Sequence, residues 1–190
     1  MAKRGRLSGG SVTGGTGDVK PQILTVAGTN AVATTVYSVQ QVTLPVAKIG
    51  FQKTRAQIVE LLKVFWNIGS EDFAANNDNI MWAFLSTNSN RTNAGTSSAA
   101  TSVQDFDDTR TLAYQKQIKS LTTSGATEGN IWESDLTDSN GNGILVAVDR
   151  LDFVYSSVGN TGAISASVKI LYRYVNVSIQ EYVGIVQSQQ

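Results

Sequence analysis

The sequence predicts an all-β protein, an antiparallel sandwich or barrel built from several short strands. Near the end of the chain, apolar and polar residues alternate from Ser165 to Tyr174, and this period of two is typical of a strand with one buried face. Two earlier runs, residues 22–27 and 35–44, are rich in β-branched and aromatic side chains. Clusters of Gly, Asn and Ser separate such runs, as tight turns between antiparallel strands require.

The remaining strands follow from the same signals. A Gly-Thr-Asn turn at Gly28–Asn30 is predicted to join the first two strands. Two short apolar runs, residues 143–148 and 151–155, predict further strands, because the turn-rich sequences DSNGNG and SSVGNTG bound them.

The middle of the chain is harder to interpret. In Arg55–Trp66 the apolar residues match one face of a helix, and they also match one face of a strand that is interrupted only by Glu60. Residues 88–101 form a polar connection too long for a hairpin, and residues 103–121 have room for a short helix. We expect residues 88–101 and 122–130 to be exposed, variable loops, because recognition usually resides on long polar loops carried by a rigid scaffold.

Length and charge predict one domain, residues 21–190, preceded by a flexible basic Gly-rich arm, residues 1–20. The arm holds six of the 17 Gly, four basic residues and one acid, a net charge of +3, whereas the other 170 residues carry 11 basic and 14 acidic side chains. A mobile basic tether binds phosphates without sequence preference, although the arm could also be a disordered terminus of no consequence. The candidates for weak contact with nucleic acid are Lys3, Arg4, Arg6 and Lys20.

Missing residue types exclude most familiar catalytic chemistry. The chain has no Cys and no His, so it cannot form a disulfide, a thiolate nucleophile, a Ser-His-Asp triad or an ordinary zinc site. Its scattered acids show no spacing that assigns a general acid and a general base; they include Glu60, Asp107, Asp108, Glu128, Glu133 and Glu181. We therefore predict that the protein is not an enzyme and uses no cofactor. We also expect a protein without a secretion signal or a membrane span, because no apolar run approaches about 18 residues.

The best match to a metal-binding pattern is the sequence from Asp138 to Asp149, which resembles the opening of a calcium loop. Its weak candidate ligands are Asp138, Asn140, Asn142 and Asp149. Only two of them are anionic, the twelfth position is Asp rather than the usual bidentate Glu, and a strand begins where the second helix should. A hairpin turn that needs positive φ, with Gly143 as the candidate position, is therefore the favoured interpretation.

Three segments resemble the capsid proteins of small circular single-stranded DNA viruses that encode a replication initiator. The C-terminal run KILYRYVNVSIQEYVGIVQSQ, residues 169–189, is similar to the strand and tail that end these proteins. The segments AQIVELLKVFWNI, residues 56–68, and NIMWAFLSTNSN, residues 79–90, are similar to two of their internal strands at the right order and distance. Together the three segments cover about a third of the chain.

The resemblance implies an antiparallel eight-stranded jelly roll that self-assembles into a small icosahedral virion shell, T=1 with sixty subunits, around a single-stranded DNA genome. It also implies a strand at residues 55–68 and an N-terminal arm turned inward. The arm departs from the family's habit, since four basic residues replace a long Arg- and Lys-rich tract. Strong genome packaging by the arm is therefore in doubt, because electrostatic affinity scales with the number of neutralised phosphates.

The tail is predicted to form part of a subunit interface, because an apolar chain end is normally docked on something. Its candidate residues are Tyr182, Val183, Ile185 and Val186, and the alternative is that they form the last core strand. A second class of function is a lectin-like ligand-binding sandwich, with tryptophans as stacking platforms and the 138–149 loop for calcium. That module would use Trp66, Trp82 and Trp132.

Overall fold

The alternating run near the end of the chain forms strand β9, Ile164–Ser178, in the computed structural model. Its even-numbered side chains from Ile164 to Tyr172 are buried, as the sequence predicts. The structure describes residues 20–30, 37–44, 55–73, 78–87, 106–120, 125–160 and 162–189. The arm before Lys20 and the predicted loop at residues 88–101 lie outside these ranges.

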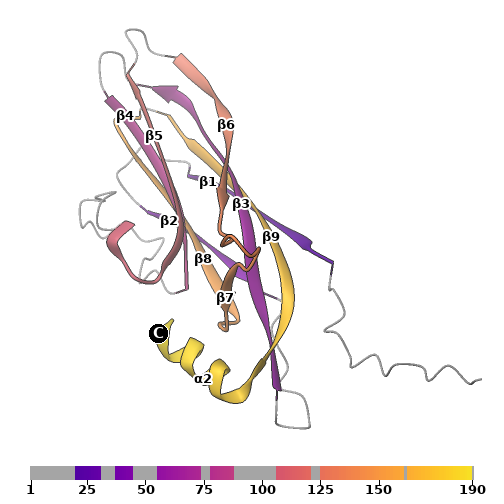
Figure 1. Ribbon diagram of the computed structural model, residues 1–190. Helices are drawn as coiled ribbons and strands as arrows, with labels where there is room; N and C mark the ends of the chain where they lie inside the picture. The colour runs from indigo at the N-terminus through magenta and orange to yellow at the C-terminus, as the bar shows by residue number, and fades with distance from the viewer. Residues whose placement is uncertain are drawn as a thin grey trace, which may run out of the picture.

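Strand β9 lies inside the first sheet, sheet A, which has the order β1-β9-β3-β6 (Figure 1). Its neighbours are β1, Gln22–Asn30, and the long strand β3, Arg55–Phe73, which pairs with β9 along most of its length. The far edge of β3 is shared by β6, Gly125–Asp135, and the short β7, Ile144–Val146.

Sheet B has the order β2-β8-β4-β5, and all of its pairs are antiparallel. Its strands are β2, Ser38–Thr43, β8, Arg150–Val158, β4, Asp78–Ser86, and β5, Thr111–Ser120. When β6 and β7 are counted as one interrupted strand and the eight strands are numbered along the chain, the two sheets have the orders 1-8-3-6 and 2-7-4-5, which define a jelly roll. The predicted fold class is confirmed.

One hydrophobic core fills the space between the sheets. Trp66 of β3 and Phe153 of β8 face each other with ring centroids 6.4 Å apart, and Tyr155 continues the aromatic contact. The Trp66 indole nitrogen donates to the Ser134 hydroxyl at 2.9 Å, so burial of this ring leaves no donor unpaired.

A β-bulge in β3 changes which side chains face this core. Leu61 pairs with Tyr172 and Lys63 with Leu171, so Leu62 has no partner on β9. Its carbonyl oxygen instead accepts from the Leu136 amide at 2.9 Å. Odd-numbered residues of β3 face the core before the bulge and even-numbered residues after it, because side chains alternate along each half.

The bulge explains the ambiguous pattern of Arg55–Trp66. A strand with a phase change places apolar residues at spacings of two and three, and those spacings also fit a helix. The strand interpretation that the family resemblance supports is confirmed over residues 55–68.

The predicted turn at Gly28–Asn30 is wrong, because these residues end β1 and pair with Ala166–Ile164 of β9. Gly28 serves a close approach rather than a turn. A Cβ there would lie 2.6 Å from the Tyr155 hydroxyl oxygen and 2.9 Å from Gln40 Cγ. Glycine is therefore required at this position because the two sheets approach closely there, and not because the chain turns.

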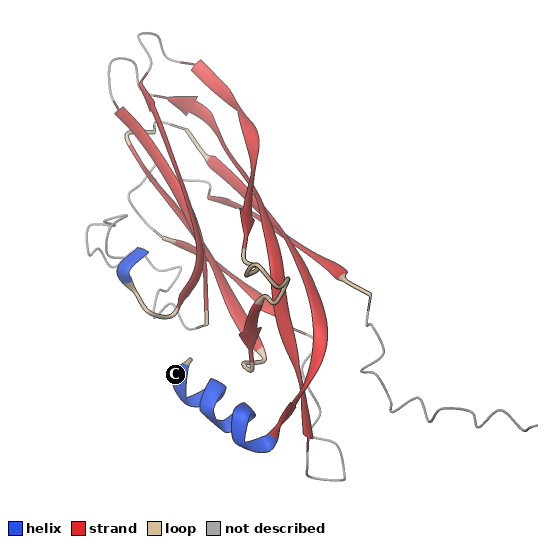
Figure 2. Cartoon of the chain, viewed as in Figure 1, coloured by secondary structure: helices blue, strands red, loops and turns tan. Residues whose placement is uncertain are grey.

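The short helix expected within residues 103–121 is present at Phe106 and Asp107, and residues 111–120 of the same segment form β5 (Figure 2). Two other expectations need correction. Residues 125–130 of the loop expected at 122–130 belong to β6. The strand expected at residues 143–148 is confined to β7.

The tail is neither a core strand nor an extended segment. It forms helix α2, Ile179–Ser188, whose N-cap Ser178 accepts a hydrogen bond from the Glu181 amide at 3.2 Å. The apolar residues of α2 recur at helical spacing and pack on the lower end of sheet A (Figure 1). No helix in the described ranges is long and apolar enough to cross a membrane.

Candidate assembly surface

The outer face of sheet A, which is directed away from sheet B, carries a row of three side chains across three strands. The bulge turns Phe65 of β3 onto this face, where it pairs with Lys169 of β9 on one side and Glu133 of β6 on the other. Neighbouring strands lie about 4.8 Å apart, so an aromatic ring separates a cation from an anion by about two strand spacings.

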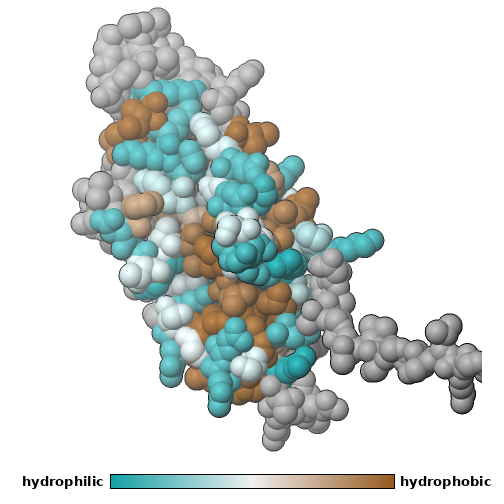
Figure 3. Space-filling view, viewed as in Figure 1, coloured by the Kyte–Doolittle hydropathy of each residue, from teal (hydrophilic) through white to brown (hydrophobic). Residues whose placement is uncertain are grey.

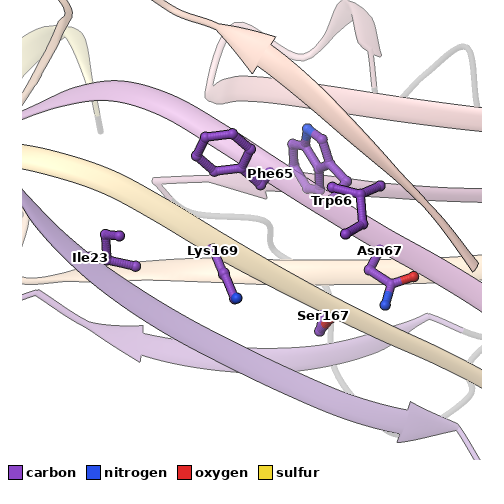
Figure 4. Close-up of a pocket in the computed structure, with 7 residues that line it drawn as sticks. Ile23, Phe65, Trp66, Asn67, Ser167 and Lys169 are labelled. Carbon is purple, nitrogen blue, oxygen red and sulfur yellow. The ribbon is translucent and has the colours of Figure 1, made fainter.

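An open hollow of about 330 Å³ lies beside this row, lined from β1, β3, β6 and β9 (Figure 4). Two isoleucines at its rim are far more exposed than is usual: Ile23 is 65% and Ile131 is 75% exposed. Asn67, Ser167 and Lys169 supply its polar lining. Apolar residues that gather around a concave surface mark a site of contact with another molecule.

The charges beside the hollow are nearly balanced. Lys63 forms ion pairs with Glu133 at 2.5 Å and Asp135 at 3.4 Å. The hydrogen bond with Glu133, supported by Asp135, raises the pKa of Lys63 above its usual range. Lys169 has Thr25 and Phe65 as its cross-strand neighbours, and in the described part of the chain no carboxylate is paired with it.

Below the bulge the outer face is covered by the chain's own tail. Ala56 and Ile58 of β3 and Val177 of β9 are buried beneath α2. The residues of α2 that cover them are Ile179, Tyr182, Ile185 and Val186. The lower part of Figure 3 shows the apolar surface that gathers around α2 and β7.

Gln189, which follows α2, seals the free edge of β7. Its side-chain amide donates to the Leu145 carbonyl oxygen at 2.6 Å, and its side-chain oxygen accepts from the Ala147 amide at 3.0 Å. These are the two bonds that a neighbouring strand would supply. The Gln189 carbonyl oxygen also accepts from the Thr87 hydroxyl at 3.0 Å, so the tail bridges the two sheets.

A buried carboxylate joins the turn before β7 to sheet A. Glu60 accepts from Arg173 Nε at 2.5 Å, from Arg173 Nη2 at 3.1 Å and from the Gly143 amide at 2.6 Å. Burial by itself would raise the pKa of Glu60, but the bonds from Arg173 and Gly143 together hold that pKa below its usual 4.5.

This pair predicts a specific dependence of stability on pH. Because its folded-state pKa is lowered, Glu60 stabilises the fold above pH 4.5, and this contribution disappears as the pH falls below 4.5. Glu60→Gln should lower the free energy of unfolding by about 2 kcal/mol at pH 7, the cost of weakening a charged hydrogen bond. The difference from wild type should shrink at pH 3.5, as urea unfolding at both pH values would measure.

Glu181→Gln is the matched control, because it removes an exposed carboxylate and should change the free energy of unfolding by less than about 0.5 kcal/mol. A Glu60→Gln variant with the same deficit at pH 7 and pH 3.5 would show that this carboxylate does not titrate with folding.

The segment expected to be a hairpin turn rather than a calcium loop is a turn, but it does not join a hairpin, because β6 and β7 on either side of it pair one after the other along the same strand, β3. The Asp138 carboxylate accepts from the amides of Asn140 and Asn142 at 2.8 and 2.9 Å, and Gly141 has φ of 78°. The bond from the Asn142 amide is the largest cause that lowers the pKa of Asp138. Among the described residues no group of three or more His, Cys, Asp or Glu could hold a metal ion, and Asp149 contributes a backbone oxygen to Leu44 instead.

The tryptophans do not form the stacking platforms of a lectin. Trp66 and Trp82 are buried, and Trp132 is partly buried against the main core. Trp82 belongs to a second cluster on the outer face of sheet B, where Tyr37 meets it edge to face. The lectin-like alternative therefore loses the residues on which it depended.

The predicted nucleic-acid and interface residues fall in different places. Lys20 is exposed two residues before the start of β1, whereas Lys3, Arg4 and Arg6 lie outside the described residues. Three interface candidates, Tyr182, Ile185 and Val186, pack against the chain's own buried residues, so their apolar side chains are covered within one subunit. Val183 points away and is 46% exposed.

Sequence reasoning missed the row formed by Phe65, Lys169 and Glu133. One member of the row and one residue of the neighbouring hollow could have been noticed, since Phe65 and Ile131 are apolar residues at positions that alternate with buried ones. The row itself depends on strand register, which local pattern does not specify.

No family model matches the sequence, and no curated protein matches it. The two sheets form a jelly-roll-like sandwich, and the solved structures that it resembles include the VP1 proteins of polyomaviruses. The VP1 of human polyomavirus 6, solved as a pentamer, is similar with a TM-score of 0.52 and 11% identity over 84% of this chain and 96% of that one. The VP1 of Merkel cell polyomavirus, solved in complex with disialyllactose, has a TM-score of 0.50 and 12% identity over 88% of this chain and 98% of that one.

A third similar structure is the VP1 of Trichodysplasia spinulosa-associated polyomavirus in complex with 3′-sialyllactose. It has a TM-score of 0.50 and 11% identity, over 88% of this chain and 97% of that one. At this level of identity the likeness establishes a shared fold, and function has to be argued from the chain itself.

Proposed function

We propose that the chain is a viral capsid protein that self-assembles into a T=1 icosahedral shell of sixty copies around a single-stranded DNA genome. The observation that carries the proposal is the jelly-roll strand order over the whole described domain. The similarity to VP1 proteins, one of them solved as a pentamer, supports association between copies. The C-terminal resemblance to capsid proteins of small circular DNA viruses supports the smaller shell and the single-stranded genome.

The surface of the chain suits assembly better than catalysis. It combines few charges, 16% of residues, with exposed isoleucines around a hollow on the outer face of sheet A. The edge strands β1, β2, β5 and β6 also present backbone groups that a neighbouring copy can cover. Symmetric association with identical copies buries such features repeatedly.

Size measurement on the purified full chain tests the proposal. Light scattering after size-exclusion chromatography should give a mass of about 1.2 MDa, sixty times 20.3 kDa, and negative-stain microscopy should show closed particles. A species of one or two chains at every salt and protein concentration would contradict the proposal.

The arm supplies a further prediction, since it carries three basic residues before position 19: Lys3, Arg4 and Arg6. Deletion of residues 1–19 should leave the shell intact and lower its nucleic-acid content, measured by absorbance at 260 and 280 nm. The salt dependence of binding to single strands should also weaken, by about 0.7 in logarithmic slope for each lost contact.

A deletion of residues 9–17 is the matched control, because it shortens the same arm without removing a charge. Its particles should package as much nucleic acid as wild type. Equal packaging by all three proteins would exclude the arm as a genome contact.

A further inference from the structure

We propose that the outer face of sheet A around Phe65 is a two-fold contact between copies of this chain, in which Lys169 of each copy lies opposite Glu133 of the other. This inference rests on the proposed function and specifies one of its interfaces. It assigns a role to the exposed hollow that the described residues of a single chain leave open.

Strand register provides the geometry. Lys169, Phe65 and Glu133 are directly paired neighbours on β9, β3 and β6, so they lie on one line across the sheet. The backbones of the two charged residues are about two strand spacings apart, roughly 10 Å, with Phe65 between them, and in the described part of the chain no ion pair joins their side chains. A two-fold axis parallel to β3 above Phe65 exchanges the two sides of this line.

This two-fold arrangement pairs the charges of Lys169 and Glu133 across the interface without any additional residue. Each cation meets the anion of the second copy, and the two Phe65 rings meet at the axis. Lys169 has no carboxylate partner in the described part of one chain, so the contact supplies what the subunit lacks. Sheets packed face to face, about 10 Å apart, would also remove Ile131 from water.

The charge balance favours a second copy over nucleic acid as the occupant. Lys63 is already paired with Glu133 and Asp135, so these two acids stand beside Phe65 and only Lys169 remains to attract a phosphate. Nucleic acid needs a surface with excess positive charge, whereas self-association needs opposite charges on the two sides of an axis.

A charge-swap cycle tests the contact. Under conditions that dissociate shells, sedimentation velocity should show Lys169→Glu weakening dimer formation by about tenfold or more, because like charges then face each other. Adding Glu133→Lys to that variant should recover a large part of dimer formation, because opposite charges again face each other across the axis, while Lys63 keeps Asp135 as its remaining carboxylate partner. Lys116→Glu, an exposed lysine of β5 on the other sheet, is the matched control and should dimerise normally. Equal dimerisation of wild type and Lys169→Glu, or no rescue in the double variant, overturns the proposal.

Cross-linking gives a second readout that does not depend on ion pairs. The natural chain has no cysteine, so a single Phe65→Cys would react only with its counterpart through a short bismaleimide. We expect a cross-linked dimer from Phe65→Cys and none from Lys116→Cys, with melting temperatures confirming that every variant is folded.

The outcomes separate this inference from the proposed function. Shells that form normally but never cross-link at position 65 would refute the two-fold contact and leave the capsid proposal standing. A wild-type chain that neither dimerises nor forms shells would refute both. Protection of position 65 only in particles that contain nucleic acid would assign this face to the genome and overturn the contact between copies.

Discussion

Gly143→Val should lower the free energy of unfolding by at least about 3 kcal/mol, because overpacking against rigid backbone has no relief. A Cβ at this position would lie 2.0 Å from the Leu61 carbonyl oxygen and 2.8 Å from the carbonyl carbon. The Gly143 amide also donates to Glu60, so displacement of the chain breaks that bond too. Urea unfolding followed by circular dichroism measures the loss.

The reason differs from the one that the sequence suggested. Positive φ belongs to Gly141, at 78°, and Gly143 is required by close approach. Gly141→Ala should therefore cost about 1 kcal/mol through backbone strain alone. Gly184→Ala is the opposite control, since nothing lies within 4 Å of the added methyl, and alanine in the middle of α2 should stabilise the fold by about 0.5–1 kcal/mol. A Gly141 variant less stable than the Gly143 variant would contradict this order.

The second large effect concerns the tail. Removal of residues 181–190 should destabilise the chain by about 3 kcal/mol, roughly 1 kcal/mol for each of Tyr182, Ile185 and Val186 that no longer covers the outer face. For a domain of this size the melting temperature should fall by about 10 °C. Exposure of Ala56 and Ile58 should also increase binding of a hydrophobic dye.

Assembly must be separated from this loss of stability. Val183→Ser changes a side chain that is 46% exposed and should leave the melting temperature unchanged. If this variant also assembles as wild type while the truncated chain does not, the tail acts by completing its own subunit. Impaired assembly by a fully stable Val183→Ser would restore the interface interpretation. A truncated chain with wild-type stability would contradict the packing described for α2.

The sequence could predict the fold class because the alternation of β9 and the Gly- and Asn-rich turns are local properties. Helix α2 was also readable in principle, since Ile179, Tyr182 and Val186 recur at helical spacing. Gly184 and the β-branched residues obscured that spacing, because they lower helix propensity, and tertiary contact with β3 overrides it.

The candidate contact surface could not be predicted, for a physical reason. Phe65, Lys169 and Glu133 come from segments far apart in the chain, and only the paired register brings them into one line. That register depends on the bulge at Leu62, which shifts Phe65 to the outer face. The ion pair of Glu60 with Arg173 was equally hidden, because it forms between residues 113 positions apart.

The bulge also makes residue count as important as residue type in β3. Loss of Leu62 would invert the phase of one half of the strand, so that either Ala56 and Ile58 or Trp66 and Ile68 would move to the opposite face of sheet A. Substitutions in this stretch disturb one position each, whereas a one-residue deletion disturbs a whole face. Natural variation in β3 should therefore change its side chains far more readily than its length.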